Sequence, residues 1–508
     1  MKAGHRKAGH RGSRFTTALA AVTLASATSL VALATPTIAS GAVAGSTYVV
    51  LYHQGASTTD ARDMVESAGG TLVANYSQIG VVIARSDNAA FDAVVKTDPK
   101  VEGAASTAGR GTRVADDVSG TAAEANTATS VQTAATWGDS LSGLQWDMAQ
   151  IHAPEAQAIN PGSRSVVVGD VDTGLDFTHP DLAPNYDAAN SVDCSGGTPA
   201  PLALGNDRNG HGTHTAGTIA AAANGTGIVG VAPGVRIAGI KSSNDDGFFF
   251  PEMVICSYMW IASHPIDLTN NSYFADPWLF NCKNDPGQRA IWKAERRAIA
   301  LAQSRGTTVL AAEGNERTDL SHPTVDLISP DNATPIVREI TNACAVIPVE
   351  IPGVVGVTAT GNLGLKSLYS SYGVSTADVA APGGDSRLLR TAAAPNGRVL
   401  STWPNGPFCG RLVVDPATGA RYCYLQGTSM ANPHATGVAA LALSAHRGTA
   451  GSLAAAVQRA TNPLSCPTDM SIYGPWPQNS GAPQVCQGGA GHTSFYGSGE
   501  VDALKAVQ

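Results

Sequence analysis

The stretch Gly427-Thr-Ser-Met-Ala-Asn-Pro-His-Ala-Thr-Gly437 decides the fold, and a small-residue apolar run follows it from Val438. It predicts a turn, with Ser429 on the first turn of a helix whose composition predicts burial. The unpaired N–H groups and the positive dipole end of that helix point towards Ser429, where an oxyanion would form. Pro433 fits because the first turn needs no donor from it. A plain helix cap is the alternative role for Ser429.

Two further stretches supply the partners that a nucleophilic serine needs. Asn209-Gly-His-Gly-Thr-His-Thr-Ala-Gly217 places His211 between glycines at the entrance of a second Ala-rich helix. The valine-rich run Ser165–Gly174 predicts a strand buried on both faces of a parallel sheet, and it ends in Asp172-Thr-Gly. Open α/β sheets place their sites at the carboxyl ends of such strands. The three stretches together therefore predict an Asp–His–Ser site.

The blocks DVDTG, NGHGTHTAG and GTSMANPHATG resemble the three signature blocks of the subtilisin-like serine proteases, and AAEGN (Ala311–Asn315) resembles a fourth. They occur in the family's order, and Asp–His–Ser is that family's order too. The resemblance implies an α/β fold: a subtilisin-like three-layer domain with a mainly parallel sheet flanked by helices. It also implies a serine endopeptidase with Asp172, His211 and Ser429 as catalytic residues and Asn315 as oxyanion donor.

The resemblance assigns substrate contacts to two strand-like segments and to the glycine before Asn315. The residues concerned are Asn270, Ser272, Gly247, Phe248 and Gly314. For Phe248, which begins a run of three phenylalanines, loop packing is the alternative to an apolar subsite.

Three residues stand apart from the family pattern or from the expected site. Asp170 lies two residues before Asp172 on the same strand face, and the sequence assigns it no role. Glu313 replaces a small residue near the expected primary specificity pocket; it faces either solvent or that pocket, and we expect solvent. His214 follows His211 by three residues and is expected to be structural.

Four segments are expected along the chain. Residues 1–44 carry five Lys or Arg and no acid before an apolar stretch, which predicts a signal peptide cleaved after Ala42-Val-Ala44 or, alternatively, Thr37-Ile-Ala39. A membrane anchor is the other reading, but Thr and Ser dilute the apolar run. Residues 45–110 show a small α+β pattern that resembles an inhibitor-like propeptide, with a retained accessory domain as the alternative. The Ala/Thr/Ser/Gly-rich residues from 104 to 136 predict a flexible connector, which we bound at 111–136, and 137–508 form the peptidase domain.

Composition sets the cellular context. The 508 residues carry a formal net charge of −8, which disfavours nucleic acid and anionic membranes as partners. Eight cysteines, an even number in a chain expected to be secreted, predict disulfides rather than metal ligands. Proximity suggests the pairs Cys409–Cys423 and Cys466–Cys486.

No cofactor is expected for catalysis, and calcium is the one metal that the resemblance raises. Asp181 and Asn224 match positions that ligate structural calcium in some relatives, and the glutamine that completes that site appears as Ser142. A hard-cation site needs about six oxygens, so these matches do not establish one.

We expect a secreted monomer, made as a zymogen, whose partners are protein or peptide substrates and its own propeptide, with no stable membrane association. Two alternatives stay open: a dedicated processing protease for one secreted precursor, and an inactive relative that acts as a binding protein. The presence of Asp172, His211, Asn315 and Ser429 argues against the second.

Overall fold

The computed structural model describes residues 45–107, 138–331, 333–388, 390–446 and 450–508. The expected signal peptide, 1–44, and the expected connector, 111–136, lie outside these residues.

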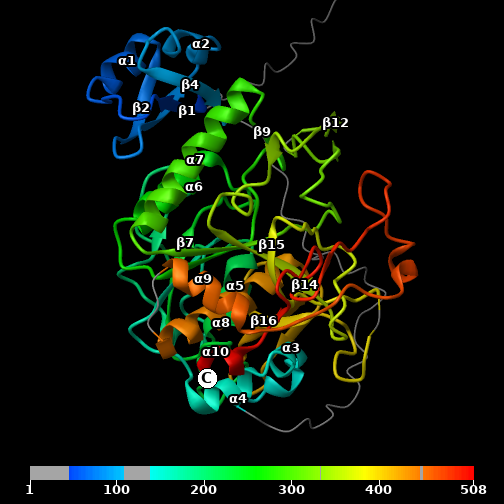
Figure 1. Cartoon of the computed structure of the whole chain (residues 1–508). Helices are drawn as coiled ribbons and strands as arrows, with labels where there is room; N and C mark the ends of the chain where they lie inside the picture. Colours follow the sequence, from blue (N-terminus) through cyan, green and yellow to red (C-terminus); the bar gives the residue numbers. More distant parts are fainter. Residues whose placement is uncertain (1–44, 108–137, 332, 389, 447–449) are drawn as a thin grey trace, which may run out of the picture. The chain divides into compact units, whose positions relative to one another are not determined.

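A nine-stranded sheet is the framework of the larger part of the chain (Figure 1), and every neighbouring pair in it is parallel except β19 with β22. Its strands, in spatial order, are β19 (Thr461–Asn462), β22 (Glu500–Val501), β15 (Ala377–Pro382), β14 (Val354–Thr360), β10 (Thr308–Ala312), β8 (Leu268–Asn271), β5 (Val167–Asp172), β7 (Arg236–Lys241) and β6 (Val192–Asp193). Asp172 is the last residue of β5, so it lies at the carboxyl edge of the sheet as its sequence predicts.

Helices cover both faces of this sheet. Successive strand residues point to opposite faces, so Val167 and Val171 join one apolar cluster and Val168 joins the other. The first cluster contains residues of α6 (Pro251–Ile261) and α7 (Pro286–Ser304). The second contains residues of α4 (Ala153–Ile159), α5 (His211–Ala220), α8 (Thr428–His446), α9 (Ala450–Arg459) and α10 (Ala503–Val507). The predicted three-layer α/β fold is confirmed.

Helix α8 begins one residue before Ser429, and this explains Pro433 differently from the sequence argument. Pro433 is the sixth residue of α8, so it lies beyond the first turn, and the expectation that it belongs to that turn is wrong. Because proline has no N–H, the carbonyl of Ser429 four residues earlier loses its intrahelical donor. The hydroxyl of Ser272 donates to that carbonyl instead, at 3.2 Å.

Residues 45–107 form an antiparallel four-stranded sheet with two short helices, in the order β2-β3-β1-β4. Its elements are β1 (Ser46–Tyr52), α1 (Ala61–Ser67), β2 (Gly70–Tyr76), β3 (Val81–Ser86), α2 (Phe91–Val95) and β4 (Val101–Ser106). The prediction that the connector begins at residue 104 is wrong, because β4 continues to Ser106 and pairs with β1. Pairing with β1 imposes the strand on Ala-Ala-Ser, which has little intrinsic strand preference.

Short helices, strands and 3₁₀ turns lie in the loops between the main elements of residues 138–508. They are α3 (Trp146–Gln150), β9 (Asn281–Cys282), β11 (Val325–Asp326), β12 (Arg338–Glu339), β13 (Cys344–Ala345), β16 (Val399–Trp403), β17 (Leu412–Val414), β18 (Arg421–Leu425), β20 (Gly488–Gly489), β21 (His492–Thr493) and three 3₁₀ turns (Ser142–Leu144, Ala183–Asn185, Met470–Tyr473).

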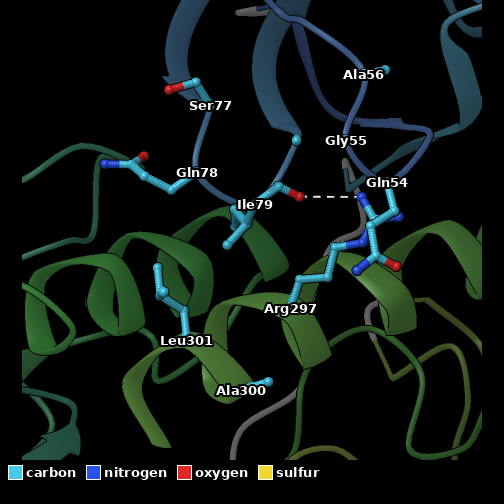
Figure 2. A pocket seen from close by; sticks show the side chains of 10 residues that line it. Gln54, Gly55, Ala56, Ser77, Gln78, Ile79, Arg297, Ala300 and Leu301 are labelled. Atoms are coloured by element: carbon cyan, nitrogen blue, oxygen red, sulfur yellow. Dashed lines mark hydrogen bonds between the residues drawn. The ribbon is translucent and has the colours of Figure 1, made fainter. Parts of the chain in front are cut away.

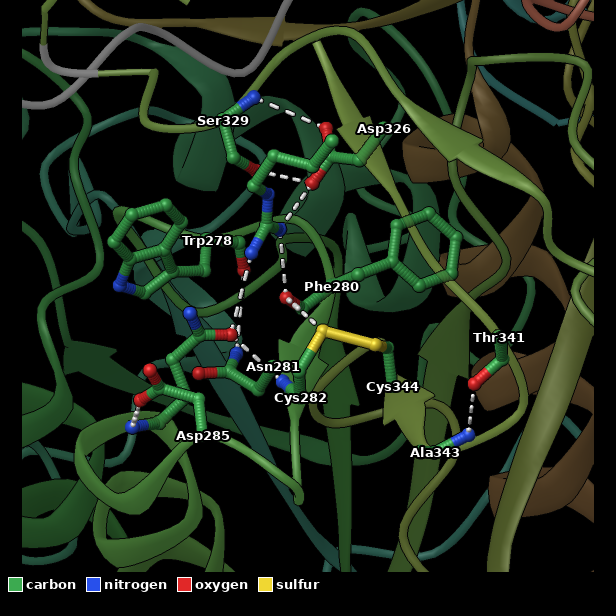
Figure 3. Close-up of a disulfide and its surroundings, with 12 residues drawn as sticks. Trp278, Phe280, Asn281, Cys282, Asp285, Asp326, Ser329, Thr341, Ala343 and Cys344 are labelled. Carbon is green, nitrogen blue, oxygen red and sulfur yellow. Dashed lines mark hydrogen bonds and ion pairs between the residues drawn. A yellow bond between two sulfur atoms is a disulfide. The ribbon is translucent and has the colours of Figure 1, made fainter. Parts of the chain in front are cut away.

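All eight cysteines form disulfides. The pairs are Cys194–Cys256, Cys282–Cys344, Cys409–Cys423 and Cys466–Cys486, so both pairs expected from proximity are confirmed. Figure 3 shows the second pair, which joins β9 to β13 beside the buried carboxylate of Asp326. Ser329 and Arg338 both bond to that carboxylate, and Arg338 also donates to the carbonyl of Phe280, so one compact network braces this loop region.

Among the residues that the structure describes, we find no helix with the length and apolar character needed to cross a membrane.

Candidate active site

His211 and Asp172 meet at the carboxyl edge of the sheet. Nδ1 of His211 lies 2.7 Å from Oδ1 of Asp172, and both side chains are buried. An ionised carboxylate only accepts hydrogen bonds, so Nδ1 carries the hydrogen and Nε2 is the basic nitrogen of the neutral ring. The backbone N–H of Thr173 also donates to Oδ1 of Asp172, at 2.7 Å, and fixes the carboxylate.

The start of α5 fixes the position of the His211 ring. Gly210 has φ 99° and precedes the helix directly, a conformation that disfavours any side chain. A Cβ there would also lie only 2.5 Å from the ring of Trp403. His214 instead places Nε2 3.0 Å from the carbonyl of Cys423, and burial followed by the charge of His211 lowers the pKa of His214 to about 3.

Ser429 lies on the first turn of α8, which packs directly against α5. Its hydroxyl donates to the carbonyl of Ser272 at 3.2 Å, and its own carbonyl accepts from the Ser272 hydroxyl. These two bonds hold the first turn of α8 against the end of β8.

Asn315 follows β10 and is oriented by the residue before Ser429. Its Oδ1 accepts hydrogen bonds from the N–H and the hydroxyl of Thr428, at 2.9 and 3.0 Å. The hydroxyl of Thr428 in turn accepts from the N–H of Gly314 at 3.1 Å. Because the oxygen end of the amide faces Thr428, the NH₂ end faces away from it, which is the orientation an oxyanion donor needs.

A small cavity of about 30 Å³ opens beside Ser429. The expected site residues that line it are Ser272, Gly314, Asn315 and Ser429. Tyr273 and Phe274 also line it, and they belong to the segment that the resemblance expects to wall the substrate pocket. The remaining lining residues were assigned no role from the sequence, namely Leu279, Ala312, Glu316, Val346 and Thr428. Glu316 had a sequence signal, since it follows Asn315 directly, whereas Leu279 and Val346 come from a distant loop region with no local motif.

Two glutamates near this cavity differ in what they face. Glu316 lines it, and burial raises the pKa of Glu316 to about 7, partly offset by the N–H groups of Asn315 and Glu316 and by the Ser371 hydroxyl. Glu313 is 1% exposed and accepts a hydrogen bond from the Thr376 hydroxyl at 3.1 Å. The expectation that Glu313 faces solvent is therefore wrong. Burial, then the charge of Glu350, raises its pKa well above the usual range.

The other expected substrate residues lie outside this cavity. Asn270 is fully buried and hydrogen-bonded between β5 and α8. Gly247 has φ 92°, and a Cβ there would lie 2.8 Å from Nδ2 of Asn209, two residues before His211. Phe248 packs against Phe250 with ring centroids 6.0 Å apart.

The surroundings of Asp181 do not fit calcium. Its Oδ2 accepts from the hydroxyl of Tyr422 at 2.9 Å and from the N–H of Ile228 at 3.1 Å, and Asn224 offers its amide NH₂ to Oδ1 at 3.4 Å. Ser142 donates its hydroxyl to Asp139 rather than facing Asp181. Hydrogen-bond donors thus occupy the directions in which a cation would need to sit. Burial raises the pKa of Asp181 to about 6.

Within the described ranges, no group of three or more His, Cys, Asp or Glu could hold a metal ion.

Comparison with known proteins identifies the family of the chain. The model of the subtilase family matches residues 163–474, more than half of the chain. Fervidolysin from Fervidobacterium pennivorans is 29% identical over 325 residues, which are 61% of this chain and 39% of that protein. Subtilisin E from Bacillus subtilis (strain 168) is 29% identical over 303 residues, 60% of this chain and 62% of that protein. The match thus spans less than two thirds of either relative.

Solved structures show the same fold. The crystal structure of the epidermin leader peptide processing serine protease from Staphylococcus aureus superposes with a TM-score of 0.66 at 20% identity, covering 91% of this chain and 98% of that one. At that identity the likeness concerns the fold alone. The match of the family model over residues 163–474, which include Asp172, His211, Asn315 and Ser429, shows that the chain belongs to the subtilase family.

Proposed function

We propose that this protein is a secreted serine endopeptidase, made as a zymogen, that hydrolyses peptide bonds through an acyl-enzyme. The observation that carries the proposal is the 2.7 Å contact between His211 and Asp172 at the end of β5, with Ser429 on the helix packed against α5. Family membership supports it, because the four sequence blocks that hold these residues fall within the matched range.

The arrangement accounts for each chemical step. Ser429 Oγ attacks the carbonyl carbon while His211 Nε2 takes its proton, and Asp172 stabilises the imidazolium that forms. The Asn315 amide and the N–H of Ser429 hold the oxyanion. Collapse breaks the C–N bond, and His211 gives its proton to the leaving amine. Water then repeats the sequence on the ester, releasing the acid and restoring Ser429.

Incubation with an unstructured protein and with a peptide substrate tests this function, using Ser429→Ala as control. We expect cleavage by the parent and a loss of about 10⁶ in kcat in the variant, the size known for the corresponding change in subtilisin. Cleavage that survives in pure Ser429→Ala would remove Ser429 from the mechanism.

The same digest separates the two alternatives. A general endopeptidase cuts an unstructured protein at many sites, whereas a processing protease for one precursor cuts it rarely or at one site. An inactive relative would leave it intact.

We also propose that residues 45–110 act as an inhibitory propeptide. Contacts of the described part of this segment with α6 and α7 support this. Glu102 pairs with Lys293 and, at 3.0 Å, with Arg297 of α7. Arg297 also donates to the carbonyls of Tyr52 and Ile79 at 2.8 and 3.1 Å, beside a cavity of about 390 Å³ (Figure 2).

Apolar packing supports the same proposal. One face of the small sheet, including Val49, Leu51 and Ile83, shares an apolar cluster with Ala294 and Ala298 of α7. Apolar burial of this kind is the main source of binding free energy, whereas partly exposed ion pairs add little.

Secretion, removal of residues 1–44 and a monomeric state belong to the same proposal, with protein or peptide substrates as partners. The four disulfides support an oxidising compartment.

A further inference from the structure

Asp170 lies two residues before Asp172 on β5 and joins two neighbouring elements. Its Oδ1 accepts from the amide of Asn270 on β8 at 2.8 Å, and its Oδ2 lies 2.9 Å from the hydroxyl of Thr215 on α5. Asp170 is 1% exposed, in a strand whose other side chains are mostly valine. A carboxyl group at such a position is costly to bury unless each of its polar atoms is paired.

The network continues from Asn270 to α8. Oδ1 of Asn270 accepts from the amide of Asn432 at 2.7 Å, and its Nδ2 also lies 3.3 Å from the hydroxyl of Ser272. We call Asp170, Thr215, Asn270 and Asn432 the Asp170 cluster; none of the four is more than 1% exposed.

Each member of the Asp170 cluster stands on an element that carries a residue of the proposed site. Asp170 shares β5 with Asp172. Thr215 is one turn after His211 on α5, and Asn432 is three residues after Ser429 on α8. Asn270 lies two residues before Ser272, whose hydroxyl holds the carbonyl of Ser429. The cluster therefore ties together the three elements whose ends must meet for the reaction.

Thr215 links α5 to β5 through its hydroxyl. The hydroxyl donates to Oδ2 of Asp170 at 2.9 Å, and it also lies 3.0 Å from the carbonyl of Gly212 on its own helix. These two contacts fix the Thr215 side chain between α5 and the strand that carries Asp172.

Electrostatics also distinguish Asp170 from an ordinary surface carboxyl group. Burial first, then the charge of Asp172 on the same strand, raise the pKa of Asp170 well above its usual range, while Asn270, Thr215 and His211 act in the opposite direction. The group that faces it from β8 is an uncharged amide, and the group from α5 is a hydroxyl, so neither supplies a countercharge.

We propose that Asp170 is a positioning residue that, through Thr215 and Asn270–Asn432, holds the first turns of α5 and α8 at fixed positions beside the end of β5. This inference rests on the proposed peptidase function. The positioning role explains why an aspartate occupies a strand position that a valine would otherwise fill. A misplacement of reacting groups by about 1 Å costs roughly 10² in rate, so fixed positions of α5 and α8 matter for turnover.

The test compares kcat and KM of the mature enzyme, produced from the whole chain, with those of Asp170→Val, Asp170→Asn and Asn432→Ala. Valine matches the shape but makes no hydrogen bond, so we expect kcat to fall by about 10² with KM nearly unchanged. Asparagine can accept from Asn270 and donate to Thr215, so it should bring kcat back to within about tenfold of the parent. Asn432→Ala cuts the branch to α8 and should also lower kcat rather than raise KM.

Asp267→Val is the matched control. Asp267 accepts from the N–H of Val167 at 2.8 Å, at the opposite end of the same two strands. It should lower stability without changing kcat.

The split between kcat and KM provides a reading that a merely structural role would not move. A positioning role lowers kcat in Asp170→Val with KM nearly unchanged, and Asp170→Asn restores it. Equal stability losses in Asp170→Val and Asp267→Val with the same parental kcat would overturn the proposal.

The outcomes separate this inference from the proposed function. An inactive parent contradicts the function. An active parent with parental kcat in Asp170→Val or Asn432→Ala contradicts the positioning role alone. If Asp170→Val is not secreted in folded form, the kcat values of Asn432→Ala and Asp170→Asn decide the matter.

Discussion

Thr428 holds the side-chain amide of Asn315 with its NH₂ group turned away from Thr428. Replacing Asn315 therefore removes one interaction, the hydrogen bond from that NH₂ group to the oxyanion. The amide donor strengthens its bond only as charge develops on the oxyanion. Asn315→Ala should therefore lower kcat by about 10²–10³ with little change in KM. Steady-state kinetics on a peptide ester and a peptide amide measure this. A rise in KM with unchanged kcat would instead assign Asn315 to substrate binding.

Glu316 is expected to make the choice of substrate depend on pH. Its pKa is about 7, so the carboxyl is neutral below that pH and anionic above it. Because Glu316 lines the cavity beside Ser429, the kcat/KM ratio for a lysine over a methionine before the scissile bond should rise as pH increases through 7. Glu316→Gln should flatten this ratio. An unchanged pH dependence in the variant would show that the lysine contacts another group.

At the scale of elements, the disulfide Cys282–Cys344 ties together the segments that deliver Leu279 and Val346 to the cavity wall. Replacing both cysteines by serine should lower stability by about 2–4 kcal/mol and loosen this wall, raising KM more than it lowers kcat.

The disulfide Cys194–Cys256 offers a matched control, since both pairs are separated by 62 residues in sequence. Its removal should cost similar stability, but none of the residues that line the cavity is adjacent to it in sequence, so KM should stay near the parental value. Equal changes in KM for both double variants would contradict the bracing role of Cys282–Cys344.

The sequence predicted the strand end and helix starts that short local motifs determine. It did not predict the positions of residues that depend on contacts between segments far apart in the chain. Asp172, His211 and Ser429 lie in short blocks whose glycines and valines determine a strand end or a helix start, so their elements could be predicted. Val346 could not be placed in the cavity, because a disulfide and the pairing of β9 with β13 bring it there.

Two of the wrong predictions, the start of the connector and the exposure of Glu313, have the same physical origin. The strand at Ala104–Ser106 exists only through its pairing with β1, and the burial of Glu313 depends on Thr376 from a later segment. Asp170 was visible as a departure, but its partners on α5 and β8 come from positions that no local pattern links to it.

At the scale of the whole molecule, the segment before the peptidase domain should regulate the site. Residues 45–110 made as a separate peptide should inhibit the mature enzyme when added to it, because their four-stranded sheet carries the apolar face that packs on α6 and α7. The inhibition constant measures this. Glu102→Gln removes the partner of Lys293 and Arg297 and should weaken inhibition several-fold, whereas the exposed pair Arg62–Glu66 is a control whose loss should change nothing. A fragment without effect on activity would leave the zymogen proposal unsupported.

The proposed mechanism requires Ser429, activated by His211, to be the nucleophile. Intact-mass and peptide-level mass spectrometry after treatment with a fluorophosphonate identify the reactive residue. We expect one adduct per molecule, on the peptide that contains Ser429, and strongly reduced labelling in His211→Ala. An adduct on another residue, or unreduced labelling of Ser429 without His211, would contradict it.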